Sequence, residues 1–208
     1  MKFSDRHVII VCMRYPAKQK VETRARLLAA AGRGFRRRGY GGIGVDGLAK
    51  EAEVTSGAFY IHFPSKEDAF KQVVVHGLEE LRDAVAELQA SHGEGWVEPF
   101  VDMYLGHKRT CELGDSCALQ SLSPEVARSD SDIRMIYQDA LLEVIEQVAK
   151  GLKGSPTDRR KRAWALLSIV AGAVTLARAV DAADVSKQIA TSVRSVAIHA
   201  AQSLAFHR

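Results

Sequence analysis

The chain has 208 residues, of which 47% are hydrophobic and 26% are charged, and these proportions exclude a fibrous or a disordered protein. The formal net charge is only +4, but residues 1–42 carry eleven Lys and Arg against two Asp and Glu. The remaining residues carry eighteen basic against twenty-three acidic side chains. A basic N-terminal segment joined to a mildly acidic remainder indicates a polyanionic partner for that segment alone.

Membrane-spanning and secreted proteins are also disfavoured. The longest uncharged apolar run, Ala163–Ala177, is shorter than the ~20 residues that a helix needs to cross a bilayer. The apolar stretch near the N-terminus is shorter than the ~7–15 residues of a signal-peptide core. Three cysteines, Cys12, Cys111 and Cys117, cannot form a disulfide framework. We therefore expect a cytoplasmic protein with no membrane partner.

Apolar residues recur with helical spacing along nearly the whole chain. The predicted helices cover about 18–38, 45–52, a short segment that begins at Thr55 or Ser56, a long segment after Ser65, Ile133–Leu152, about 158–180 and about 184–206. The only β-like run, His7–Cys12, has no partner strand. The sequence therefore predicts an all-α fold.

Three of these helices carry more detailed expectations. Val21, Ala25, Leu28 and Phe35 fall on one stripe of the first helix, which predicts its buried face. Ser65 is a suitable N-cap for the long helix. The segment 158–180 is apolar nearly all round, which predicts burial on most of its sides.

Residues 45–62 have the layout of a helix-turn-helix, because two short helices follow a basic helix and are joined by a few residues. In this arrangement the second helix enters the major groove of DNA, and its first residues meet the base edges. Ser56, Gly57 and Ala58 are small enough for a close approach. Tyr60 and His62 carry hydrogen-bonding groups, and Lys66 is placed to pair with a phosphate.

The stretch TRARLLAAAGRGFRRRGYGGIGVDGLAKEAEVTSGAFYIHFPSKEDAF resembles the DNA-binding domain of TetR-type transcriptional regulators. The matching positions are Thr23, Arg24, Ala29, Ala30, Phe35, Gly39, Tyr40, Leu48, Ala49, Val54, Thr55, Gly57, Tyr60, Phe63, Ser65, Lys66 and Glu67. The resemblance implies an N-terminal helix-turn-helix domain, 18–65, and a helical domain for effector binding and dimerisation, 66–208. Residues 1–17 are then an N-terminal extension without a fixed fold.

The resemblance and the layout together give the expected DNA contacts. In the family the first helix contributes mainly near its start, and the run Arg36–Arg38 adds to the field that attracts phosphates. The predicted DNA-binding residues are Lys18, Lys20, Arg24, Gly44, Thr55, Ser56, Gly57, Ala58, Tyr60, Ile61, His62 and Lys66.

Three departures from the family pattern occur. Ile43 and Gly44 stand where a side-chain cap is usual, so Gly44 is expected to act as a weak cap. Glu53 replaces the glycine of the turn and must either adopt an unfavourable φ or change the turn. Ala58 and Phe59 replace residues of the recognition helix. These departures leave open an adaptor that has the helix-turn-helix fold but has lost tight DNA binding.

Other chemistry has little support in the sequence. The glycines between Gly39 and Gly47 satisfy a dinucleotide-binding string, but that motif requires a preceding strand, and a basic helix precedes it here. No nucleophile, paired-carboxylate or metal-ligand motif is present, so we expect no enzymatic activity, no cofactor and no metal.

The resemblance also implies a homodimer formed by the last two helices, a near-palindromic operator and a small-molecule effector that releases it. The recognition helices of such a dimer would lie about 34 Å apart. The predicted wall of the effector pocket consists of Met103, Tyr104, His107, Cys111, Cys117 and Trp164. Some relatives with a similar CALQSLSPEVA segment carry a reactive thiol near it, which leaves open an electrophile- or redox-sensing repressor acting through Cys117.

Overall fold

The computed structural model describes residues 17–202, with side chains from Lys20 onward. These residues form ten α-helices and two 3-10 helices, so the predicted all-α fold is confirmed for the part of the chain that is described. The helices are α1 (Ala17–Arg38), α2 (Val45–Glu51), α3 (Ser56–His62), α4 (Lys66–His92), α5 (Val97–Leu105), α6 (His107–Thr110), α7 (Ala118–Ala127), α8 (Ser131–Lys150), α9 (Pro156–Ala179) and α10 (Ala183–Gln202), with η1 (Gly93–Gly95) and η2 (Leu113–Asp115) between them. The β-like run His7–Cys12 and the C-terminal residues 203–208 lie outside the described residues.

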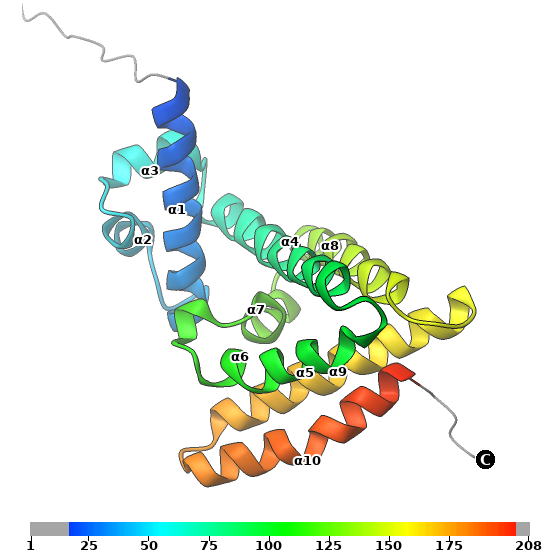
Figure 1. The fold of residues 1–208 in the computed structure, drawn as a ribbon. Helices are drawn as coiled ribbons and strands as arrows, with labels where there is room; N and C mark the ends of the chain where they lie inside the picture. Colours follow the sequence, from blue (N-terminus) through cyan, green and yellow to red (C-terminus); the bar gives the residue numbers. More distant parts are fainter. Residues whose placement is uncertain (1–16, 203–208) are drawn as a thin grey trace, which may run out of the picture.

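Helices α1, α2 and α3 pack around a small aromatic and aliphatic core (Figure 1). Leu27 and Phe35 of α1, Leu48 of α2 and Phe59 of α3 are all buried there. The predicted stripe of α1 is wrong in its first two turns, because Val21 is 68% exposed and Ala25 is also exposed. The N-terminal turns of α1 project beyond α2 and α3, so the buried face begins at Leu27.

Helix α4 connects this N-terminal part to the rest of the chain. Its N-cap is Ser65 as predicted, since the Ser65 hydroxyl accepts a hydrogen bond from the Asp68 amide at 3.0 Å. Phe70 near its start belongs to the same core as α1–α3, and so do Leu122 of α7 and Ile133 of α8. The expected domain boundary after residue 65 thus coincides with a turn, while the hydrophobic core continues across it.

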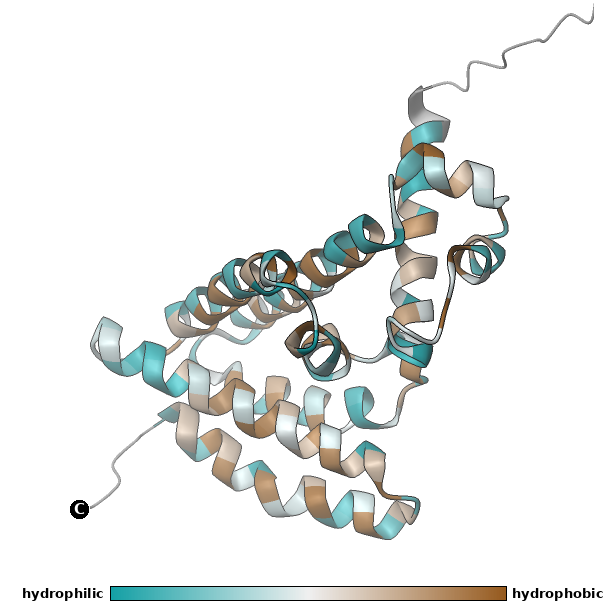
Figure 2. Cartoon of the chain, turned by 180° about the vertical axis from the view of Figure 1, so that it is seen from behind, coloured by the Kyte–Doolittle hydropathy of each residue, from teal (hydrophilic) through white to brown (hydrophobic). Residues whose placement is uncertain are grey.

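A second core fills the space between α4, α5, α8, α9 and α10. Figure 2 shows hydrophobic positions on the sides of α4 and α8 that face each other, and hydrophobic positions distributed around α9. Trp96, at the start of α5, is fully buried and donates a hydrogen bond from its indole nitrogen to the Gly151 carbonyl at 2.9 Å. The two clusters meet along α4, so one helix supports both halves of the molecule.

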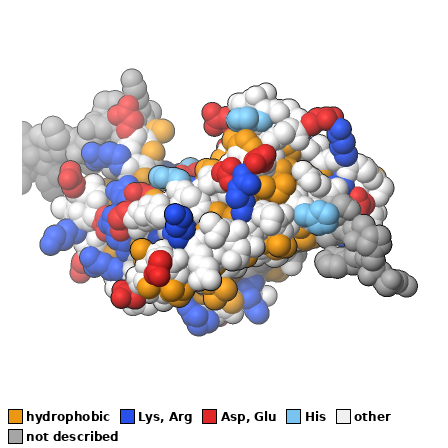
Figure 3. All heavy atoms as spheres, turned by 60° about the horizontal axis from the view of Figure 1, so that its bottom comes forward, with side chains coloured by type: hydrophobic (Ala, Val, Ile, Leu, Met, Phe, Trp, Pro, Cys, Tyr) orange, Lys and Arg blue, Asp and Glu red, His pale blue; other side chains and the backbone are white. Residues whose placement is uncertain are grey.

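Helix α9 is the one described helix that is long and apolar enough to cross a membrane by length and composition alone. It packs against α8 and α10 as a core helix, with Leu166 and Val170 buried. The expectation that it is covered on most sides is wrong for a single chain, because Trp164 is 37% and Leu176 62% exposed. Figure 3 turns the bottom of Figure 1, where α10 lies, forward and shows hydrophobic side chains at the surface.

Candidate nucleic-acid interface and adjoining cavity

The two ends of α2 accommodate the departures from the usual cap and glycine pattern. Gly44 is the N-cap of α2 and, as expected for a residue without a side chain, makes no side-chain cap bond. Glu53 adopts a φ of +57°, so it tolerates the left-handed conformation that a glycine would adopt without strain. The helix-turn-helix geometry is therefore kept at some cost in backbone strain.

Helix α3 presents one side to the core and the other outward. Its N-cap is Thr55, whose hydroxyl accepts a hydrogen bond from the Ala58 amide at 3.2 Å. Ser56 donates to an Asp46 carboxylate oxygen at 2.5 Å, which ties the start of α3 to α2. Tyr60 and Ile61 are 55% and 68% exposed, because Phe59 is the residue that anchors the helix in the core. Such an exposed helix face is what a major groove admits.

Basic side chains flank this face. Lys20 on α1 is exposed, and Arg24 lies with its guanidinium 5.7 Å from the centre of the Phe63 ring and donates to the amide oxygen of Gln72. Lys66 places its ammonium 4.3 Å from the centre of the Tyr40 ring. Lys18 belongs to α1, but its side chain lies outside the described residues.

His62 ends α3 and is partly buried. Burial lowers the pKa of His62, and the positive charges of Lys20 and Arg24 lower it further. Its Nδ1 atom is buried and has no hydrogen-bond partner among the described residues. The imidazole therefore favours its neutral form beside an otherwise positive surface.

The remaining predicted contacts, Gly57 and Ala58, lie in the first turns of α3; Gly57 is exposed and Ala58 is half-buried. All of the predicted DNA-binding residues with described side chains thus lie on α3, beside it, or on the neighbouring parts of α1, α2 and α4. Their contact with DNA stays a prediction.

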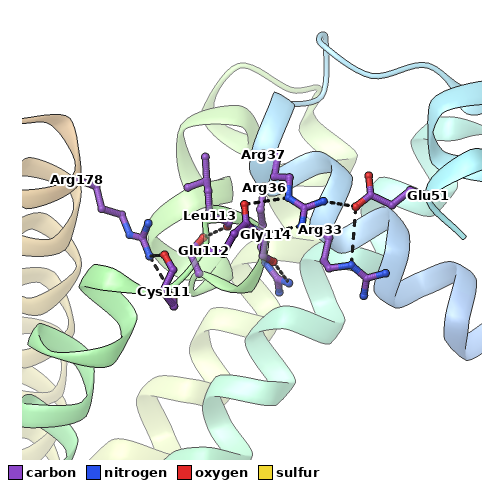
Figure 4. A network of polar contacts seen from close by, with 10 residues as sticks. Arg33, Arg36, Arg37, Glu51, Cys111, Glu112, Leu113, Gly114 and Arg178 are labelled. Atoms are coloured by element: carbon purple, nitrogen blue, oxygen red, sulfur yellow. Dashed lines mark hydrogen bonds and ion pairs between the residues drawn. The ribbon is translucent and has the colours of Figure 1, made fainter. Parts of the chain in front are cut away.

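The C-terminal end of α1 behaves differently, because its arginines bind carboxylates and carbonyls of other elements (Figure 4). Arg37 donates to both carboxylate oxygens of Glu112 at 3.0 Å and also pairs with Glu51 of α2. Arg36 donates to the Gly114 carbonyl and to Glu80, each at 3.3 Å. Arg37 lowers the pKa of Glu112. We expected the run Arg36–Arg38 to add to the positive field that attracts DNA phosphates. For Arg36 and Arg37 this expectation is corrected, because carboxylates of the same molecule offset their charge.

Sequence reasoning missed this network. A run of three arginines resembles a solvated or DNA-facing surface, and its acidic partner Glu112 lies far away in the sequence. The same segment is bound from its other side, since Arg178 of α9 donates to the carbonyls of Lys108 and Cys111 at 2.7 and 3.0 Å (Figure 4). Residues 108–114 consequently connect α1 with α9.

A cavity of about 690 Å³ adjoins this segment. It lies between α4, α5 and the start of α7, and its size falls within the range of small-molecule sites. Three of the predicted pocket residues, Met103, Tyr104 and Cys117, contribute to its wall. Arg36 of α1 also contributes, so the cavity extends to the helix that carries the candidate interface.

The other three predicted pocket residues lie elsewhere. His107 is exposed on α6, and Cys111 accepts a hydrogen bond from Arg178 on its sulfur at 3.1 Å. Trp164 lines a shallower groove between α7, α8 and α9, because its side of α9 faces away from α4. No group of three or more potential metal ligands occurs within residues 17–202.

Comparison with known proteins agrees with this arrangement. Residues 27–73 match the family model described as bacterial regulatory proteins, tetR family. No curated protein matches the sequence at a significant level. Among solved structures, the reduced form of Escherichia coli NemR has a TM-score of 0.71 at 22% identity, covering 85% of this chain and 95% of that one.

Two further structures have the same fold. A TetR transcriptional regulator from Legionella pneumophila gives a TM-score of 0.71 at 17% identity and covers 85% of this chain and 96% of its own. The fatty acid degradation regulator FadR from Bacillus halodurans gives a TM-score of 0.65 at 18% identity, and the match covers 89% of this chain and 97% of that one. At these identities the structures show the fold, and the family model adds the DNA-binding domain. Residues 27–73 therefore carry the DNA-binding domain of the tetR family of bacterial regulatory proteins, within a chain that has the fold of solved TetR regulators.

Proposed function

We propose that the protein is a ligand-responsive repressor that acts in the cytoplasm and leaves a near-palindromic operator when a small molecule fills the cavity between α4, α5 and α7. The observation that carries this proposal is that the cavity wall includes Arg36, a residue of the helix that supports α3. Ligand binding and DNA binding therefore share a structural element, which is the minimum that coupling between two sites requires.

The DNA contacts in this proposal are those of the predicted set. Tyr60 and Ile61 reach base edges from the exposed side of α3, and Lys20, Arg24 and Lys66 neutralise phosphates on either side. Exposure of the two large side chains supports this assignment, since neither contributes to the core.

A homodimer built from α9 and α10 supplies the second recognition helix. Leu176 on α9 and Val196 on α10 are 62% and 55% exposed, and a second copy would cover both. A Leu176→Glu variant is then expected to sediment as a monomer and to lose operator binding, whereas the wild type sediments as a dimer. A wild-type monomer that binds the operator as one copy would contradict this interface.

The segment 108–118 is the element that we propose couples the two sites. Its residues Cys117 and Ala118 line the cavity, while Glu112 and Gly114 hold Arg37 and Arg36 of α1. A ligand that moves this segment changes the orientation of α1, and with it the distance between the two α3 helices of the dimer. The ligand does so only by binding the two orientations with different affinity.

Arg37→Gln tests this coupling. The variant loses the paired contact with Glu112 but retains a polar side chain, so operator binding without ligand is expected to persist. The effector concentration needed to release the operator is expected to shift several-fold, because Arg37 joins the two regions. An unchanged release curve would exclude a role for this contact. Arg38→Gln, at an exposed neighbouring position, is the matched control.

DNA binding itself is tested by a salt titration with the protein's own promoter DNA. A steep loss of affinity with rising salt is expected, since bound phosphates release counterions. If no specific complex forms at any salt concentration, the protein is not a repressor of this promoter. That result would favour an adaptor that has kept the fold but lost tight DNA binding, an alternative suggested by the strained Glu53.

A second candidate function uses the same cavity. Cys117 lies in its wall and is the N-cap residue of α7. In an electrophile- or redox-sensing repressor, covalent modification of the Cys117 thiol would release the operator, in place of reversible binding of an effector. Release of the operator by an electrophile in the wild type but not in Cys117→Ser would support it. Equal release of the operator by the wild type and by Cys117→Ser would exclude sensing through this thiol.

A further inference from the structure

The cavity wall contains two polar groups whose hydrogen-bonding capacity is unused. The hydroxyl of Tyr104 is fully buried and has no hydrogen-bond partner among the described residues, and the same holds for Nε of Arg36. Both groups can donate a hydrogen bond. Unpaired buried donors are costly, so a site that keeps two of them is suited to a molecule that brings acceptors.

The Tyr104 hydroxyl remains a donor at neutral pH. Burial raises the pKa of Tyr104 well above its ordinary value, and the neighbouring Cys117 adds to this effect. The neighbouring Cys117 sulfur is only a weak acceptor, so it does not take the place of a carbonyl oxygen.

Charge in the wall disfavours an anionic molecule. Three carboxylates line the cavity, those of Glu80, Glu87 and Asp115. They outnumber its two permanent cations, Arg36, which pairs with Glu80 at 3.3 Å, and Lys108, which donates to the Asp115 carbonyl at 3.3 Å. Within residues 17–202 no basic side chain forms an ion pair with Glu87 or Asp115. An anion entering the cavity would therefore meet excess negative charge.

The rest of the wall is apolar. Leu81, Ala84 and Leu88 of α4 face Met103 of α5 and Ala118 of α7. A flexible methionine in such a wall adapts to the shape of an apolar ligand. The body of the molecule that fills this space is accordingly hydrophobic.

We propose that the effector is a neutral, largely hydrophobic carbonyl compound whose oxygen accepts a hydrogen bond from the Tyr104 hydroxyl. This inference rests on the proposed function, because it names the chemical class that the same cavity recognises. Fatty acids and other carboxylates are excluded by the charge of the wall, and pure hydrocarbons leave Tyr104 unpaired.

Three naphthalenes of nearly equal shape test the assignment on the full-length protein by isothermal titration calorimetry. They are 2-acetylnaphthalene, which carries the carbonyl, 2-ethylnaphthalene, which lacks it, and 2-naphthoate, which is anionic. The ketone is expected to bind about tenfold more tightly than the hydrocarbon, the gain from satisfying one buried donor. The carboxylate is expected to bind more weakly than the ketone.

Tyr104→Phe is the diagnostic variant, and it is expected to bind the ketone and the hydrocarbon with equal affinity. It should fold as well as the wild type, because it removes an unpaired hydroxyl from the core. Tyr137→Phe is the matched control. The Tyr137 hydroxyl is already bonded to Ser123 at 2.7 Å and does not line this cavity, so the wild-type preference should persist.

Several results would overturn the inference. They are equal binding of ketone and hydrocarbon by the wild type, the same preference in Tyr104→Phe, tightest binding by the carboxylate, or no ketone binding at about 1 mM, the weak limit for such a ligand. Operator binding is measured separately. If the operator complex forms and the ligand preference is absent, only this inference fails; if no operator complex forms at any salt, the proposed function fails.

Discussion

The two ends of α1 carry the same kind of side chain and use it differently. At the N-terminal end, Lys20 is exposed beside α3, and Arg24 has a neutral hydrogen-bond partner, Gln72. At the C-terminal end, Arg36 and Arg37 are bound to the carboxylates of Glu80 and Glu112 and to the Gly114 carbonyl. A run of basic residues in a sequence therefore does not locate the charge that meets DNA. The acidic residues that fold against the run decide this.

This difference gives each end of α1 its own role. The N-terminal end retains charge that DNA phosphates can neutralise, and phosphate contacts dominate affinity. At the C-terminal end, Arg36 and Arg37 are paired with groups of the same molecule, and these contacts fix the orientation of the helix. One helix thereby joins attraction to DNA at one end with control of its position at the other.

The largest effect is expected where α4 packs closely against the start of α7, beside Arg36 of α1. A Cβ atom added to Gly77 would overlap the Cβ of Ala118 and come within 3.0 Å of Arg36 Nη2. Gly77→Ala is expected to lower the free energy of unfolding by about 1–3 kcal/mol, the usual cost of overpacking. Chemical denaturation measures it.

Gly57→Ala is the control for that substitution. Its added Cβ would meet only Thr55 Oγ1 at 3.8 Å, an ordinary contact, so stability should stay the same or rise slightly. Equal stability of Gly77→Ala and the wild type would show that α4, α7 and Arg36 separate easily, and would weaken the view that this end of α1 is held in place.

The next effect distinguishes the two ends in DNA binding. Lys20→Ala is expected to weaken operator binding about three- to tenfold and to reduce the salt slope by about 1, because one phosphate contact is lost. Arg37→Gln should leave the slope unchanged, since its charge is already paired with Glu112 and Glu51. Fluorescence anisotropy at several salt concentrations measures both. A reduced slope in Arg37→Gln would reverse the assignment of the two ends.

A smaller effect is expected at the strained turn. Glu53→Gly should raise the free energy of unfolding by up to about 1 kcal/mol, because glycine adopts the left-handed conformation without a steric penalty. The exposed carboxylate also repels DNA, so operator affinity should increase. Glu53→Gln separates the two causes, since it removes the charge and keeps the strain. A lower free energy of unfolding for Glu53→Gly than for the wild type would contradict the presence of backbone strain at Glu53.

The smallest effect is a change in the titration of His62. Its pKa is lowered by burial and then by Lys20 and Arg24, so Lys20→Ala should raise it and Arg37→Gln should not. Imidazole resonances in NMR spectra report both values. A Lys20→Ala protein with an unchanged His62 pKa would place Lys20 away from α3.

The sign of the accompanying pH dependence follows from the direction of the shift. Because the folded protein has the lower pKa, the unfolded chain binds the proton first as the pH falls. The contribution of His62 to stability is therefore complete above the ordinary value of about 6.5 and is lost as the pH falls from there to the folded pKa. His62→Gln should remove this slope.

Local sequence patterns were sufficient for the helices that they predicted, although α5, α6 and α7 were not among them. The cap at Ser65 and the unfavourable φ at Glu53 both depend on neighbours within a few positions, so spacing and residue type predicted them. The register of α1 was harder. Val21 has the right spacing for a buried stripe, but its burial depends on how far α2 and α3 extend along α1.

The cavity and the arginine network could not be derived in the same way. Trp164 is large and apolar and thus a reasonable wall residue, but the rotation of α9 about its axis directs it outward. Arg37 meets Glu112 only because α1 ends against the segment before α7. Both depend on the relative placement of elements that are distant in sequence.

Arg36 belongs to α1, the helix that supports α3, and it also lines the cavity. If the cavity binds the effector as proposed, this double position limits how the protein can acquire a new one. A substitution at Met103 or Leu88 reshapes the cavity far from α1 and leaves the DNA-reading half intact. A substitution at Arg36 alters both activities in one step. Selection for new ligands is therefore expected to change the α4 and α5 side of the wall and to spare this arginine.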